Sequence, residues 1–179
     1  YLEGPSSKNF TPGQVNRCTH FAGGRLRTRL PKPGKNYTVY LWFWNGMPLD
    51  SRPVLGWMFS RGQNHSLNAP GDHLGMDAKG HLLLGDGGRT YHGKTPVKRW
   101  TWRQTTLVRE VGKAKIYLDG KLEIEASVKK GSGGDHFFIG GRNDSQANWE
   151  GRLDEVALFD RPLTSSEIKN LTHSMNHGN

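Results

Sequence analysis

Short segments in which apolar and polar residues alternate recur along most of the chain, and turn-forming residues separate them. The clearest segment is 37–44, where Val39, Leu41 and Phe43 would lie on one face of a strand and three aromatic side chains on the other. Further strands are expected at 54–60, 73–77, 81–84, 105–109, 113–118, 122–128 and 137–140, with two short ones within 17–30 and one near Tyr91. Many short strands with turns between them predict an antiparallel β-sandwich.

The end of the chain departs from this alternation. After a strand that begins near Glu150, a proline turn leads into the sequence TSSE at 164–167. This S/T-x-x-E spacing is that of a capping box, which predicts that a helix begins there. We therefore expect an all-β domain over 17–172, a two-sheet antiparallel β-sandwich with one short C-terminal helix. Residues 1–16 are expected to form an irregular lead-in and 173–179 a polar tail.

The hairpin within 113–128 can be built in two registers. A two-residue loop would put the Glu123 carboxylate opposite the core residue Ile116. A three-residue loop instead puts Leu122 opposite Ile116 and Lys115 opposite Glu123. Because this second register is consistent on both faces of the hairpin, we prefer it.

Composition limits the class of protein. The chain has 179 residues, which suits a single domain, and only 34% are hydrophobic, so the core has to be thin. Its one cysteine, Cys18, leaves no internal disulfide. No stretch approaches the roughly 20 apolar residues of a membrane helix, so no membrane insertion is expected. Because the chain opens with Tyr1 and shows no signal peptide, we expect a piece of a longer or processed protein.

The charge of the chain favours one kind of partner. The formal net charge is +9, which attracts anionic molecules over long range. Sulfated or carboxylated polysaccharide, nucleic acid and acidic surfaces all qualify. The basic residues are dispersed along the sequence and no nucleic-acid-binding module is recognised, so nucleic acid is not an expected partner.

Several segments together resemble the laminin-G-like, concanavalin A-like lectin/glucanase superfamily. In chain order these are Phe21-Ala22-Gly23-Gly24, 37–43, Trp102 with 106–109, the hairpin 115–121, Phe138-Ile139-Gly140-Gly141, 151–156 and the strand-to-helix ending at 150–171. The resemblance covers most of the chain and implies a jelly roll with long loops along one rim. It also implies a domain that binds glycans or proteins, in an extracellular or periplasmic location.

Many members of this superfamily hold a calcium ion between early and late segments of the domain. The resemblance therefore implies a structural calcium ion, for which Asp154 could supply one carboxylate. The opening motif departs from the family pattern, because Ala22 stands where an aspartate is common. A hydrogen-bonded strand residue is the alternative role for Asp154.

The glucanases of the superfamily carry two catalytic carboxylates on one strand, in a Glu-x-Asp-x-x-Glu pattern. The nearest sequence here, Glu123-Ile124-Glu125, lacks the central aspartate and the third acid. The preferred hairpin register also pairs each glutamate with a lysine, which lowers rather than raises a carboxyl pKa. We therefore expect this domain not to be an enzyme, although its parent protein can be one.

Saccharides are bound by stacking on aromatic faces and by planar polar groups, and a guanidinium group suits carboxylate or sulfate. Four tryptophans are assigned to packing: Trp42, Trp57, Trp102 and Trp149. Trp44 and Trp100 remain as the aromatic candidates. The polar candidates come from three rim-loop regions and are Arg61, Asp72, His73, Arg89, His92, Arg99, Arg142 and Asn143.

The sequence thus predicts a non-catalytic, lectin-like carbohydrate-binding module of a larger protein, with acidic or sulfated polysaccharide favoured. Two alternatives remain open. One is a protein-interaction or structural domain that packs on another domain of the parent chain. The other is a glycoside hydrolase of the same fold, in which two carboxyl groups would lie about 5–5.5 Å or 6.5–9.5 Å apart in a cleft.

Overall fold

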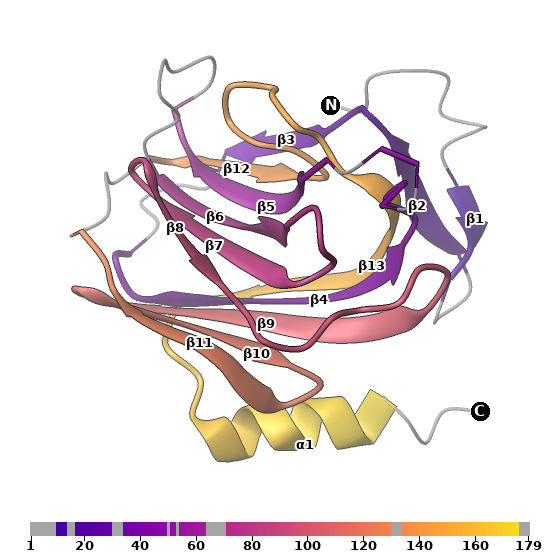
Figure 1. The fold of residues 1–179 in the computed structure, drawn as a ribbon. Coiled ribbons are helices and arrows are strands. Elements are labelled where there is room, and N and C mark those ends of the chain that lie inside the picture. Colours follow the sequence, from indigo (N-terminus) through magenta and orange to yellow (C-terminus); the bar gives the residue numbers. More distant parts are fainter. Residues whose placement is uncertain are drawn as a thin grey trace.

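The computed structural model describes residues 10–13, 17–29, 34–49, 51–52, 54–63, 71–129 and 134–175. Two antiparallel sheets pack face to face, and a C-terminal helix lies against the outer face of one of them (Figure 1). This confirms the expected sandwich, which is consistent with a jelly roll. Within the described ranges, no helix is long and apolar enough to cross a membrane.

The first sheet has seven strands, and both early and late parts of the chain contribute to it. In the order of hydrogen-bonded neighbours they are β1 (Phe10–Pro12), β2 (Arg17–Ala22), β13 (Glu150–Phe159), β4 (Tyr37–Asn45), β9 (Trp102–Glu110), β10 (Lys113–Leu118) and β11 (Lys121–Ser127). Because β13 lies between β2 and β4, its start is brought beside their ends. Glu150 is paired with Ala22, and Gly151 with Asn45.

The second sheet has six strands. In neighbour order they are β3 (Leu26–Arg29), β12 (His136–Ile139), β5 (Gly56–Gly62), β6 (Gly71–Met76), β7 (Leu82–Asp86) and β8 (Arg89–His92). From β5 to β8 each strand pairs with the next in sequence, so this half of the sheet is a meander.

The core lies between the sheets and follows the alternation predicted for β4. Val39, Leu41 and Phe43 are buried in one apolar cluster to which both sheets contribute. Burial of each such side chain contributes about 1.5–3 kcal/mol. The even-numbered side chains of β4, among them Trp42 and Trp44, therefore point to the outer face of the seven-stranded sheet.

Helix α1 (Ser165–Met175) begins at the predicted capping box. The Thr164 N–H donates to Glu167 Oε2 at 2.8 Å, and the Glu167 N–H donates to Thr164 Oγ1 at 3.3 Å. Hydrogen bonds from Arg161 and Thr164 lower the pKa of Glu167 to about 2. The cap is therefore a charged one at neutral pH.

The helix covers part of the seven-stranded sheet. Leu163 and Ile168 form a second buried cluster with Val108 of β9 and Tyr117 of β10. α1 continues to Met175, three residues beyond the expected domain boundary at 172. The last residues of the expected tail, 176–179, lie outside the described part of the chain.

The hairpin of β10 and β11 differs from the preferred register. Its loop has two residues, with Leu118 opposite Lys121, so the expected three-residue loop is wrong. Asp119 and Gly120 have φ values of 46° and 73°. This is the left-handed pair of conformations that a type I′ two-residue hairpin turn requires.

A β-bulge then restores the apolar pairing in this hairpin. The register shifts after Ile116, so that Ile116 faces Ile124, Lys115 faces Glu125, and Glu123 is the extra residue. The expected pairing of Lys115 with Glu123 is therefore wrong. The extra residue allows a two-residue turn and also keeps Ile116 opposite an apolar residue. A regular two-residue hairpin would instead put Glu123 opposite Ile116.

Two strand boundaries differ from expectation in a way that affects the candidate site. β5 extends to Gly62 and β6 begins at Gly71, so Arg61 and Asp72 lie in strands and are buried. The middle of the predicted loop between them, 64–70, lies outside the described residues. In the expected lead-in, β1 pairs with β2, and residues 1–9 and 14–16 of that segment are likewise outside the described residues.

Candidate functional site

A cluster of tryptophan and arginine side chains lies where β4 ends. The indole rings of Trp44 and Trp100 are 4.8 Å apart between centroids and tilted by 46°. The guanidinium carbon of Arg99 lies 4.2 Å from the Trp100 ring centroid, and that of Arg152 lies 4.5 Å from the Trp44 ring centroid. These four residues are named the tryptophan–arginine surface. It joins three predicted candidates to Arg152, which the sequence analysis did not identify.

Asn45, the last residue of β4, holds the segment that carries Trp100. Its carbonyl accepts the Trp100 N–H at 2.8 Å, and its own N–H donates to the Thr101 carbonyl at 3.2 Å. Its side-chain Nδ2 donates to the Val97 carbonyl at 2.9 Å. Because Asn45 is fully buried, these bonds are shielded from water. β4 thus carries one tryptophan and fixes the loop that supplies the other.

Trp100 is held in an unfavourable conformation. Its side chain is 56% exposed, and its φ of 65° lies in the left-handed region that bulky residues rarely adopt. Such a conformation costs on the order of 1–3 kcal/mol and persists only where the surroundings over-determine it. Its hydrogen bond to Asn45 and the ring contact with Trp44 provide that support. The result is a large aromatic side chain presented to solvent.

Arg152 brings positive charge and one unsatisfied donor to this cluster. Its Nη1 donates to the Pro12 carbonyl at 3.2 Å, and its Nε is buried without a hydrogen-bond partner. Among the described residues it has no ion-pair partner. His20, which is opposite Arg152 on β2, also has a buried ring nitrogen without a partner. A guanidinium group on an aromatic face is suited to carboxylate or sulfate oxygens.

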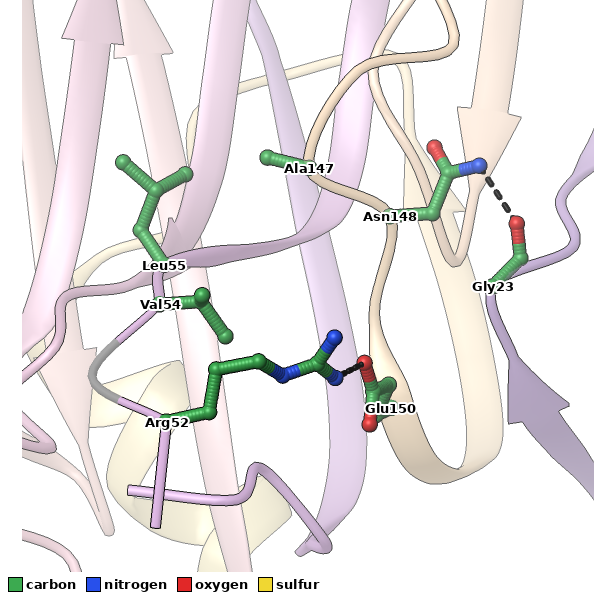
Figure 2. Close-up of a pocket in the computed structure, with 7 residues that line it drawn as sticks. All are labelled: Gly23, Arg52, Val54, Leu55, Ala147, Asn148 and Glu150. Atoms are coloured by element: carbon green, nitrogen blue, oxygen red, sulfur yellow. Dashed lines mark hydrogen bonds and ion pairs between the residues drawn. The ribbon is translucent and has the colours of Figure 1, made fainter. Parts of the chain in front are cut away.

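A pocket opens at the same end of the sandwich, and β13 contributes to it as well. Its volume is about 420 Å³, and it is lined by Gly23, Arg52, Val54, Leu55, Ala147, Asn148 and Glu150. It is named the rim pocket. Figure 2 shows the Arg52 guanidinium group reaching across to the Glu150 carboxylate, with which it forms an ion pair. Val54, Leu55 and Ala147 supply apolar walls.

The loop that forms one wall of the rim pocket is strained and tightly tied. Ser145 and Ala147 have φ values of 62° and 50°, both in the left-handed region. Arg142 forms hydrogen bonds of 2.9 and 2.7 Å with the two carboxylate oxygens of Asp144. Burial would raise the pKa of Asp144, but the bonds from Arg142 and a backbone N–H outweigh it and lower the pKa. Arg142 was predicted as a ligand-binding residue, but these hydrogen bonds show that it holds the conformation of the loop.

The opposite end of β4 carries a different polar cluster, between the sheets. The Tyr37 hydroxyl donates to Asp72 Oδ2 at 2.7 Å, and Arg109 Nε donates to Asp72 Oδ1 at 2.9 Å. The Arg61 guanidinium lies 4.9 Å from the Tyr37 ring centroid and donates to two backbone carbonyls. Burial, and then the Asp72 carboxylate, raise the pKa of Tyr37 well above its usual value. Arg61 and Asp72 are thus inside the sandwich and not on a rim loop.

His73 and Asn143 meet at Ser60 on β5. Ser60 Oγ lies 2.8 Å from His73 Nδ1 and accepts the Asn143 N–H at 3.1 Å. The guanidinium carbon of Arg142 lies 5.5 Å from the ring centroid of Trp57, which also contacts His73. Ser60, His73 and Asn143 are all buried, so this group joins the loop to the six-stranded sheet.

Arg89 and His92 lie on β8 at the edge of the six-stranded sheet and are exposed. His92 Nδ1 is 2.8 Å from Asp77 Oδ2. Burial would raise the pKa of Asp77, but hydrogen bonds from the His81 N–H, His92 and the Lys79 N–H outweigh it and lower the pKa. The predicted polar candidates are therefore spread over several places. Arg99 lies over the ring of one aromatic candidate, Trp100, which in turn contacts the other, Trp44.

The two glutamates of the nearest catalytic-like pattern have separate partners. Glu123 accepts the backbone N–H groups of Lys94 and Thr95 at 2.9 and 3.1 Å, and the Thr95 hydroxyl at 2.6 Å. Burial would raise the pKa of Glu123, but these bonds outweigh it and lower the pKa. Glu125 faces Lys115 at 3.8 Å. The lowered pKa of Glu123 is the opposite of what a general acid requires.

Asp154 lies on β13 beside a β-bulge and is largely buried. Its Oδ1 accepts the Glu155 N–H at 3.0 Å. Within the described ranges, no group of three or more His, Cys, Asp or Glu side chains could hold a metal ion. Calcium at Asp154 would therefore depend on backbone carbonyls, and it stays a prediction.

A family model described as the concanavalin A-like lectin/glucanases superfamily matches residues 22–169. The chain belongs to this superfamily. The match runs from the end of β2 into α1 of this concanavalin A-like domain, and it confirms the resemblance that the sequence motifs carry. A comparison with curated proteins found no match.

Solved structures share the fold of this concanavalin A-like domain. Domain 4 of AbnA, a GH43 extracellular arabinanase from Geobacillus stearothermophilus in complex with arabinotriose, gives a TM-score of 0.68 at 18% identity, over 91% of this chain and 80% of that chain. A heptameric SAP-like pentraxin from Limulus polyphemus gives 0.62 at 17% identity, over 83% and 75%. A Trypanosoma rangeli sialidase gives 0.75 at 18% identity, over 94% of this chain and 29% of that chain. At these identities the likeness concerns the fold alone, which occurs in enzymes as well as in binding domains.

Two contributors to the site escaped the sequence analysis. Arg152 lies in the motif 151–156, which was used only for the family resemblance, yet its position one residue before the inward-facing Leu153 places it on the outer face. Asn45 precedes Gly46 and resembles an ordinary turn residue. The alternation in β13 could have indicated that Arg152 points outward, but only the pairing of β13 with β4 sets it opposite Trp44.

Proposed function

We propose that this domain is a non-catalytic, lectin-like carbohydrate-binding module of a larger extracellular or periplasmic protein. The tryptophan–arginine surface is its binding site, and acidic or sulfated polysaccharide is its preferred ligand. The observation that carries the proposal is the exposed Trp100, in tilted ring contact with Trp44 and flanked by the guanidinium groups of Arg99 and Arg152.

The chemistry of this surface supports both parts of the proposal. Indole rings offer flat apolar faces on which the C–H groups of a sugar ring stack, and the guanidinium groups offer planar donors for carboxylate or sulfate. The formal net charge of +9 adds long-range attraction for an anionic chain. The strained backbone of Trp100 supports a functional role, because such strain tends to be retained at binding sites.

The carboxylates support a non-catalytic role for this domain. Glu123 is engaged by the segment at 94–95, and its lowered pKa suits a structural acceptor. Glu125 faces Lys115 on the neighbouring strand. A glycosidase needs two carboxyl groups about 5–10 Å apart across a cleft, one of them with a raised pKa.

The alternative function is docking on another domain of the parent chain. Val156 and Leu158 favour it, because both are large apolar side chains that are 41% and 40% exposed on β13. The Trypanosoma rangeli sialidase, of which this chain spans 29%, shows that the fold occurs within much longer chains. Binding of an isolated glycan at Trp100 separates the two functions.

A glycan array of uronate-bearing, sulfated and neutral polysaccharides, run with calcium and with a chelator, tests the proposal. We expect binding to anionic members, weakened about tenfold or more by Trp100→Ala, a loss of about 1.4 kcal/mol. Arg99→Gln should weaken anionic ligands more than neutral ones. Leu122→Ala, which truncates another exposed apolar side chain, is the matched control. Absence of binding to every glycan, or equal binding by Trp100→Ala and Leu122→Ala, would contradict the proposal.

A further inference from the structure

The rim pocket lies next to the tryptophan–arginine surface but differs from it in chemistry. We infer that the pocket is a second saccharide subsite, which takes a neutral sugar unit of the same chain whose anionic unit lies on the tryptophan–arginine surface. The ligand is then a polysaccharide in which anionic and neutral units alternate. This inference rests on the proposed function. It adds to that function a prediction of how charged and uncharged units are arranged along the ligand.

The pocket has the size and lining of a sugar subsite. Its volume of about 420 Å³ falls within the range of roughly 300–1,000 Å³ that small-molecule sites occupy. Val54 and Leu55 offer apolar contact for ring C–H groups, and Leu55 is 36% exposed. Arg52 and Glu150 offer planar groups that can hydrogen-bond hydroxyls.

Charge distinguishes the pocket from the surface beside it. Arg52 and Glu150 are the two charged residues of the lining, and they form an ion pair with each other. The lining therefore has no net charge, and an incoming carboxylate would have to compete with Glu150 for Arg52. On the tryptophan–arginine surface, in contrast, Arg152 forms no ion pair with any of the described residues, and a second guanidinium group, that of Arg99, lies over Trp100. A neutral unit suits the pocket and an anionic unit suits the surface.

The pocket wall is pre-formed. The Ala147 carbonyl accepts the Trp57 N–H at 2.9 Å, and the Asn148 Nδ2 donates to the Gly23 carbonyl at 2.5 Å. These bonds tie the strained loop to β5 on one side and to the end of β2 on the other. A wall that is already ordered loses little conformational entropy when a ligand binds.

The two subsites lie on one strand. Glu150 lines the pocket and Arg152 belongs to the surface, and two residues along a strand separate their Cα atoms by about 7 Å. Gly46 and Gly151 allow this arrangement, because a Cβ on Gly46 would come within 2.9 Å of the Gly151 Cα. Adjacent units of one chain can therefore reach both sites.

Isothermal titration calorimetry with three tetrasaccharides tests the inference: hyaluronan and unsulfated chondroitin, in which uronate alternates with an uncharged N-acetylhexosamine, and tetragalacturonate, in which every unit is anionic. The wild type should bind at least one alternating chain about tenfold more tightly than tetragalacturonate. Leu55→Asn should remove most of that preference, whereas Val111→Asn, at another exposed apolar side chain, should keep it. Glu150→Gln should raise the affinity for tetragalacturonate severalfold, unlike its charge-matched control Glu125→Gln.

Each remaining outcome overturns the inference. Equal effects of Leu55→Asn and Val111→Asn on the affinity for alternating chains would show that the pocket is not part of the binding site. If Leu55→Asn weakened the binding of alternating and uniform chains equally, the pocket would not select a neutral sugar unit. The same conclusion would follow if the wild type preferred tetragalacturonate or bound none of the three tetrasaccharides. In each of these cases the glycan array decides independently whether the proposed function stands.

Discussion

Both ends of β4 place an arginine over an aromatic ring, with opposite consequences. At the start of the strand, Arg61 lies over Tyr37 between the sheets and donates to backbone carbonyls, so its donors are used within the fold. At the end of the strand, Arg152 lies over Trp44 on the outer face and keeps a donor without a partner. The same kind of contact, an arginine over an aromatic ring, thus occurs once with its donors bound to the fold and once with a donor left unpaired.

The difference teaches that the contact itself does not define a site. A cation over a ring contributes about 0.5–2 kcal/mol, depending on how far it is removed from water. What separates the two ends of β4 is whether the fold satisfies the remaining polar atoms and whether solvent reaches the ring. The following substitutions are ways to break or sharpen this contrast.

The largest effect is expected at the buried end. Arg109→Ala leaves the Asp72 carboxylate buried without its cationic partner, which should lower the free energy of unfolding by about 3–5 kcal/mol. Arg99→Ala removes an arginine at the exposed end and should change it by less than about 0.5 kcal/mol. Urea unfolding measures both. Similar losses of unfolding free energy in the two variants would contradict the proposed difference between the buried and the exposed end of β4.

An intermediate effect is expected at Glu123, which holds the segment leading to Trp100. Glu123→Gln should lower the free energy of unfolding by about 1–2 kcal/mol at neutral pH, because a charged acceptor of three hydrogen bonds is lost. Glu125→Gln should change it by less than about 0.5 kcal/mol, since Glu125 has only a loose ion pair at the surface.

The effect of Glu123 should depend on pH. Its pKa in the folded protein lies below the usual value of 4.5, so the carboxylate stabilises the fold above that pH. The stabilisation is lost as the pH falls below 4.5 through the lowered pKa. Unfolding curves of the wild type and Glu123→Gln should therefore converge in acid, and a constant difference between them would contradict this account.

The smallest effect separates strain from binding at the exposed end. Trp100→Gly and Trp100→Ala both remove the indole ring and should weaken glycan binding equally. Because φ is 65° at this position, Trp100→Gly should be the more stable variant by about 1 kcal/mol. Thermal unfolding measures the difference, and equal stabilities would show that the backbone there is not strained.

Much of the fold could be predicted because it depends on local patterns. Alternation placed Val39, Leu41 and Phe43 in the core, and the capping box placed the start of α1. The hairpin register could not be predicted in the same way. A β-bulge adds one residue without changing the composition of either strand, so Glu123 gives no local sign that it is the extra residue.

In the candidate site, too, only the features that depend on local sequence could be predicted. The sequence selected Trp44, Arg99 and Trp100 by residue type, but it gave equal standing to Arg61 and Asp72, which the sandwich buries. It also passed over Arg152 and Asn45, because their roles arise from partners far away in the chain.

By itself, the sequence determined a two-sheet antiparallel sandwich with a capped helix, since side-chain periodicity and capping act between near neighbours. Only the tertiary structure decided which arginines face solvent beside an aromatic ring and which are enclosed. The insertion of β13 between β2 and β4 makes that decision, because it brings Arg152 against Trp44 and sets Glu150 beside the end of β2. Pairing between distant strands leaves no mark in the local order of residues.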